Sequence, residues 1–127
     1  MAWSLPAHAR REQRALLAAG IDSWRALADL SEGQLAQLAL EQGASAVTLR
    51  RLRGQAQLVV DLQLEPAEAA LLLHAGIADA RGLARADPQQ LWVQTGRLQR
   101  RLTGEAVTPP DLATVRRWIE RARRARN

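Results

Sequence analysis

The chain repeats itself, and this internal repeat constrains its fold more than any other feature. When the sequence is aligned with itself, Leu16–Leu35 matches Leu72–Leu91, and ten of the twenty aligned positions are identical. A second alignment matches Thr48–Ala56 with Thr114–Ala122, and the change in register places an insertion between Val93 and Val107. Self-similarity of this kind is typical of a duplicated supersecondary unit. The chain is therefore predicted to contain two related units, residues 1–64 and 65–127, within one compact domain.

Helix start and stop signals divide the first unit into four helices. These helices are predicted at residues 6–19, 23–30, 31–43 and 45–62. Pro6 suits a first helical turn, and Gly20 suits a helix end. Ser31 and Gln34 have the spacing of a capping box, in which each side chain binds the backbone N–H of the other residue.

The second unit follows the same plan. Its first helix is predicted to begin at Pro66 and to end at Gly76. Asp87, Pro88 and Gln90 predict the cap, first turn and capping-box partner of a later helix. The last helix is predicted to begin at Thr108 and Pro109, with an apolar stripe at Leu112, Val115, Ile119 and Ala122. No segment alternates as a strand would, so the predicted fold class is all-α, with two four-helix units that share one core.

A glycine followed by an isoleucine ends the first helix of each unit, as Gly20-Ile21 and as Gly76-Ile77. The glycine suits a left-handed helix end, and the isoleucine is predicted to anchor the turn in the core. This pattern resembles the tandem helix-hairpin-helix superfamily. More narrowly, the segment Leu71–Leu91 and the closing Val115–Ala122 resemble an uncharacterised helix-hairpin-helix family common in cyanobacteria.

The resemblance implies a role in binding DNA, but both hairpins depart from the DNA-binding pattern. Helix-hairpin-helix proteins that bind DNA without sequence preference carry a second glycine, which lets the backbone N–H groups approach a phosphate. Asp22 and Ala78 stand at that position here. Asp22 is a suitable helix cap, yet it places a carboxylate where the phosphate would lie. The two hairpins are therefore better explained as capped turns.

The basic residues are all arginine, and they concentrate in the second half of the chain. The net charge is +5, with seven arginines against six acids in residues 1–64 and eleven against seven in residues 65–127. Arginine binds carboxylates and phosphates through its planar fork, so the excess favours an anionic partner. A GC-rich genome is an alternative explanation, because arginine and alanine are both abundant.

The arginines of the last helix are the best candidate contacts. Arg117, Arg121 and Arg124 are spaced to share one helix face, and Arg116 flanks it. A second cluster, Arg97, Arg100 and Arg101, is expected to extend this surface. Solvation of a helix end, where cations offset the helix dipole, is the structural alternative.

The tryptophans are predicted to serve packing rather than base stacking. Trp118 lies beside the apolar stripe of the last helix, and Trp24 lies in a short helix, so both are expected in the core. Trp92 is expected to be half-buried. Trp3 precedes the first helix, where it would be an exposed anchor or a cover for the core.

Catalytic, metal-binding and membrane-spanning patterns are missing from the sequence. Cysteine is absent, and His8 and His74 have no neighbouring constellation of catalytic or metal-binding residues. No apolar run is longer than Ala69–Leu73, which is far too short to cross a bilayer, and no signal peptide is evident before residue 14. We therefore expect a cytoplasmic, non-enzymatic protein without a cofactor, a metal or a membrane role.

The predicted function is a helix-hairpin-helix adaptor that binds another protein, one with an acidic surface. The alternative is sequence-independent binding of DNA or RNA through the basic last helix and the second hairpin. The departures in both hairpins favour the first function, and the basic second half favours the alternative.

Overall fold

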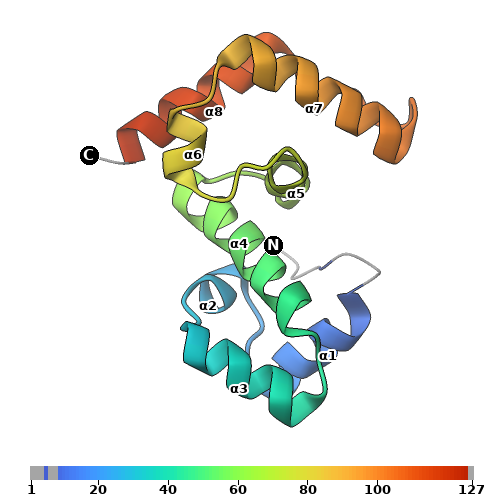
Figure 1. The fold of residues 1–127 in the computed structure, drawn as a ribbon, viewed down its shortest axis with the longest axis vertical. Coiled ribbons are helices and arrows are strands. Elements are labelled where there is room, and N and C mark those ends of the chain that lie inside the picture. The colour runs from blue at the N-terminus through green and yellow to red at the C-terminus, as the bar shows by residue number, and fades with distance from the viewer. Residues whose placement is uncertain (1–4, 6–8, 126–127) are drawn as a thin grey trace.

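The computed structural model describes Leu5 and residues 9–125, and over these residues the chain is all-helical. The helices, in chain order, are α1 Arg10–Ala18, α2 Trp24–Ala28, α3 Glu32–Gln42, α4 Ala46–Leu62, α5 Pro66–His74, α6 Ala80–Ala84, α7 Pro88–Thr103 and α8 Leu112–Ala125 (Figure 1). The predicted helix start at Pro6 and the environments of Trp3 and His8 lie outside the described residues.

Short polar side chains before the helices explain where several of them begin. The capping box of α3 is confirmed, because Ser31 Oγ accepts from Gln34 N at 3.1 Å and Gln34 Oε1 accepts from Ser31 N at 2.9 Å. Ser45 Oγ accepts from Thr48 N at 3.2 Å and starts α4 in the same way. These side chains satisfy N–H groups that have no partner within the helix.

The predicted start of α7 is confirmed, with Asp87 as its cap and Pro88 in its first turn, but its capping-box partner and the start of the last helix are wrong. At α7 the carboxylate of Asp87 accepts from Gln89 N at 3.2 Å, so the cap forms without the predicted partner Gln90. The last helix begins at Leu112 instead of Thr108, because Asp111 Oδ1 accepts from Thr114 N at 2.8 Å and supplies the cap.

The two halves of the chain have matching packing partners. In the first half α2 packs on α4, α3 on α4 and α1 on α3; in the second half α6 packs on α8, α7 on α8 and α5 on α7. Helix α4 connects the halves, because it also contacts α5, α6 and α8 and runs through the middle of the molecule (Figure 1).

One hydrophobic cluster extends through both halves and contains apolar residues at aligned positions of the repeat. Leu16, Leu27, Leu35 and Leu49 are fully buried, and the aligned Leu72, Leu83, Leu91 and Val115 are at most 3% exposed. Trp24 and Trp118 lie in this core, as predicted. Trp92 is 39% exposed.

Helix α7 has 16 residues, whereas α3, its counterpart in the alignment, has 11. The insertion between Val93 and Val107 therefore lengthens α7 and supplies the loop that follows it. The end of α7 projects from the right side of the molecule in Figure 1. This extension carries Arg100 and Arg101 away from the core that both halves share.

Candidate interaction surface

The hairpin glycines end their helices in the same conformation. Gly20 has φ +83° and Gly76 has φ +88°, values that favour glycine over residues with a Cβ. Ile21 N donates to Leu16 O at 2.8 Å, and Ile77 N donates to Leu72 O at 2.9 Å. Both isoleucines are partly buried against the core, as predicted. Each turn therefore satisfies the carbonyl groups at the end of its helix.

The outer sides of the hairpins carry carboxylates. Asp22 is exposed, and Ser23 rather than Asp22 caps α2, because Ser23 Oγ accepts from Ala26 N at 3.1 Å. In the second hairpin Ala78 is exposed, and Asp79 Oδ1 accepts from Gly82 N at 2.8 Å. A phosphate approaching either turn would meet a carboxylate close by, which opposes its binding.

The arginines of α8 take different roles in the structure. Arg121 is partly buried and donates from one guanidinium nitrogen to Leu62 O at 2.9 Å and to Gln63 O at 3.2 Å. It therefore caps the end of α4, where Gln63 has a left-handed φ of 53°. Arg123 donates from Nε to Ala84 O at 3.1 Å, at the end of α6. Neither contact was predicted from the sequence, which shows charge and helix face but not the distant carbonyls.

The other α8 candidates, Arg116, Arg117 and Arg124, are exposed. Arg117 donates to the hydroxyl of Thr114 at 3.0 Å, so one of its nitrogens is used within the helix. In the same part of α8, the hydrogen bond from Thr114 N lowers the pKa of Asp111, and Arg117 lowers it further. Arg116 makes no hydrogen bond or ion pair within residues 9–125.

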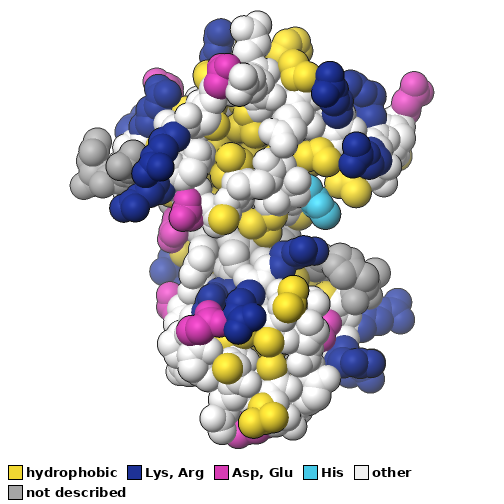
Figure 2. All heavy atoms as spheres, viewed as in Figure 1, with side chains coloured by type: hydrophobic (Ala, Val, Ile, Leu, Met, Phe, Trp, Pro, Cys, Tyr) yellow, Lys and Arg dark blue, Asp and Glu magenta, His cyan; other side chains and the backbone are white. Residues whose placement is uncertain are grey.

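Arg97, Arg100 and Arg101 are all exposed on α7, but they do not continue the α8 surface. The ends of α7 and α8 point to opposite sides of the molecule in Figure 1, and the arginines in Figure 2 form separate groups. The predicted single basic surface is therefore two basic surfaces, one on each helix.

The outer face of α7 also carries apolar side chains. A groove of about 860 Å³ follows this face. Its lining includes Val93 and Leu98 next to Arg97 and Arg101. Val93 is 44% exposed. We call Val93, Arg97, Leu98 and Arg101 the α7 surface.

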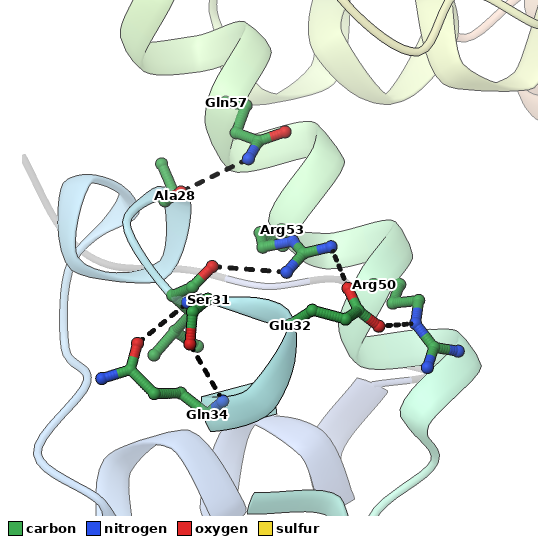
Figure 3. A network of polar contacts seen from close by, with 8 residues as sticks. Ala28, Ser31, Glu32, Gln34, Arg50, Arg53 and Gln57 are labelled. Carbon is green, nitrogen blue, oxygen red and sulfur yellow. Dashed lines mark hydrogen bonds and ion pairs between the residues drawn. The ribbon is translucent and has the colours of Figure 1, made fainter. Parts of the chain in front are cut away.

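Acidic and basic side chains pair between α3 and α4 in the first half. The Glu32 carboxylate binds Arg50 Nε through one oxygen and Arg53 at 2.7 Å through the other (Figure 3). Hydrogen bonds from Arg50 and then Arg53 lower the pKa of Glu32. These are the ion pairs present within the described part of the chain, and both belong to the first half.

A second groove lies between the start of α7 and α8. It has a volume of about 370 Å³ and is lined by Pro88, Arg116, Ile119, Glu120 and Arg123. Ile119 is 2% exposed and belongs to the core, whereas Arg116, Glu120 and Arg123 are exposed. We call this cavity the α7–α8 groove.

One buried acid was not singled out from the sequence. Glu12 on α1 is 5% exposed, and its Oε2 accepts from Ser45 N at 3.0 Å, so it binds the residue that caps α4. Among the described residues no group of three or more histidines and acids could hold a metal ion. No helix in this part of the chain is long and apolar enough to span a membrane.

These features define an all-helical protein that carries separate groups of exposed arginines on α7 and α8 of its second half. A family model described as a domain of unknown function, DUF4332, matches residues 6–125, so the chain belongs to this family. The same comparisons find no match among curated proteins and none among solved structures.

Proposed function

We propose that the protein is a non-catalytic interaction module, built from two helix-hairpin-helix units, that binds an acidic surface of another protein. The observation that carries this proposal is the α7 surface, where exposed Val93 and half-buried Leu98 lie beside the two arginines of that surface. The buried core of a protein interface is apolar and arginine is enriched in such interfaces, so exposed aliphatic side chains beside arginines favour a protein partner.

The equivalence of the two units has support beyond the aligned sequence. Both hairpins have the same glycine conformation and the same hydrogen bond from isoleucine. Gln57 on α4 donates to Ala28 O at 3.4 Å, and Arg123 on α8 donates to Ala84 O at 3.1 Å. The first alignment places the acceptor Ala28 opposite the acceptor Ala84. The second alignment, extended by one residue, places the donor Gln57 opposite the donor Arg123. A contact between distant helices therefore recurs at aligned positions.

A protein partner accounts for the α7 surface better than a nucleic acid does. Binding to a phosphate backbone needs cations, and single-stranded binders add aromatic stacking, but neither gains from exposed aliphatic side chains. The carboxylates at Asp22 and Asp79 also oppose phosphate binding at the hairpins. Sequence-independent binding of DNA or RNA stays the alternative, because the arginines of α7 and α8 suit any anion.

Fluorescence anisotropy with two labelled probes tests this function. One probe is a peptide that alternates glutamate and leucine residues, and the other is a duplex DNA, each titrated at about 50 and about 200 mM salt. We expect the peptide to bind more tightly. Its binding should weaken about tenfold in the variant R97Q/R101Q, which removes two charge-assisted contacts.

The matched control is R10Q/R14Q, which removes two exposed arginines at the same helical spacing from α1. We expect this variant to bind the peptide as the unmodified chain does. Tighter binding of the DNA, with a steep dependence on salt and no effect of Val93→Ser, would replace the protein-binding function with the nucleic-acid alternative.

A further inference from the structure

The internal repeat aligns an ion-pair network of the first unit with an open groove of the second. Glu32 is the first residue of α3, and its carboxylate reaches across to Arg50 and Arg53 on α4 (Figure 3). Arg53 also donates to Leu30 O at 3.3 Å, so the guanidinium is held in place while it binds the carboxylate. The first unit thus fills this junction with an acidic side chain of its own.

The second unit keeps a basic residue of this arrangement and lacks the acid. The first alignment places Pro88 opposite Glu32, and the second places Arg116 opposite Arg50. Both Glu32 and Pro88 are the first residues of their helices, and each follows a capping side chain. A proline side chain has no carboxylate to offer, so Arg116 faces the α7–α8 groove without a partner among the described residues.

Arg123 supplies the second guanidinium of the groove. The residue aligned with Arg53 is Ile119, which forms part of the groove and of the core instead. Arg123 lies one helical turn further along α8, and its Nε donates to Ala84 O at 3.1 Å. This bond fixes the Arg123 guanidinium and leaves both of its terminal nitrogens available. The bond to Leu30 O holds the Arg53 guanidinium in place in a similar way.

We propose that the α7–α8 groove binds a carboxylate side chain of the partner protein. This carboxylate takes the place that the Glu32 carboxylate has in the first unit. This inference rests on the proposed function and names one contact of the acidic partner. Arginine and carboxylate groups match in geometry and form strong, charge-assisted hydrogen bonds.

The charge of the groove favours a carboxylate over a nucleic-acid backbone. Arg116 and Arg123 contribute two positive charges and Glu120 contributes one negative charge, so a single positive charge is left over. One aspartate or glutamate side chain neutralises that charge. A phosphodiester backbone presents a row of negative charges, more than the single positive charge of the groove can neutralise.

The variant Pro88→Glu tests the site without removing an arginine. A glutamate at this position would place a tethered carboxylate beside Arg116, as Glu32 lies beside Arg50, and would compete with the partner. We expect about tenfold weaker binding of the labelled glutamate–leucine peptide, close to the effect of Arg116→Gln. The control Pro88→Gln has a similar shape without the charge and should bind as the unmodified chain does.

The reciprocal variant Glu32→Pro frees Arg50 and Arg53 in the first unit. Proline is tolerated at the first position of a helix, so α3 should still form, which circular dichroism would check. Isothermal titration calorimetry with the same peptide should then show two binding sites per chain in place of one. Arg116→Gln in the Glu32→Pro background should weaken one of the two about tenfold.

The outcomes separate this site from the proposed function. Equal peptide binding by Pro88→Glu and Pro88→Gln, with loss of binding in R97Q/R101Q, would overturn the groove site and leave the protein-binding function standing. Absence of peptide binding by the unmodified chain at about 50 mM salt, with tight binding of duplex DNA, would overturn both.

Discussion

Arg121 illustrates at the residue scale how a charged side chain on a basic helix can serve the fold. Its guanidinium is partly buried and binds Leu62 O and Gln63 O, two carbonyls at the end of α4. Such carbonyls have no partner within their own helix and need a donor from elsewhere. Arg121 therefore links the last helix of each half of the chain.

We expect Arg121→Ala to lower the free energy of unfolding by about 1–2 kcal/mol, because a charged donor to backbone carbonyls is lost from a partly buried place. Urea denaturation followed by circular dichroism measures this change. Arg124→Ala is the control, since exposed Arg124 makes no hydrogen bond or ion pair in the described residues, and it should change stability by less than about 0.5 kcal/mol. Equal effects of the two variants would contradict the capping role.

At the scale of elements, the junction between α3 and α4 depends on the charge of Glu32. Arg50 and Arg53 lower the pKa of this carboxyl in the folded state, chiefly through hydrogen bonds. The ionised form is thus favoured by folding, and its contribution is complete above the pKa of the unfolded chain. It is lost as the pH falls through the lower folded-state pKa, so acid should loosen this junction.

We therefore expect the Glu32 carboxyl resonance to titrate below its ordinary range in NMR spectra, and to return toward that range in the variant R50Q/R53Q. Glu32→Gln should reduce the loss of stability in acid, because its side chain has no charge to lose. A Glu32 resonance that titrates identically with and without the two arginines would show that the ion pairs do not form in solution.

The helix boundaries show how far local sequence signals reach. Ser31 and Gln34 were sufficient to place the start of α3, because a capping box involves only neighbouring residues. The start of α8 was misplaced at Thr108. Pro109 is followed by Pro110, and a residue before proline is disfavoured in the helical conformation, so the helix begins only after Asp111.

At the scale of the whole molecule, the sequence located the core and the arginines but not their arrangement in space. Aligned leucines such as Leu27 and Leu83 were identifiable because both units need the same buried positions. The direction of α7 relative to α8 depends on contacts between distant helices, and no spacing within one helix encodes it. The two basic surfaces and the α7–α8 groove therefore needed the structure.

Helix α4 makes the two halves depend on each other. It packs on α2 and α3 of its own half and also on α5, α6 and α8. Leu83 on α6 is fully buried in the cluster that spans both halves. Leu83→Ala removes core contacts and leaves a cavity, which costs about 2–5 kcal/mol. If the chain unfolds as one cooperative unit, this loss should appear in both halves.

Amide hydrogen exchange measures where the loss appears. We expect the most protected amides of α2 and α4 to lose as much protection in Leu83→Ala as those of α8, because they exchange only when the shared core opens. Leu27→Ala, at the aligned position on α2, should give the mirrored result. Reduced protection confined to the half that carries the substitution would show instead that each half opens independently, with α4 belonging only to the first.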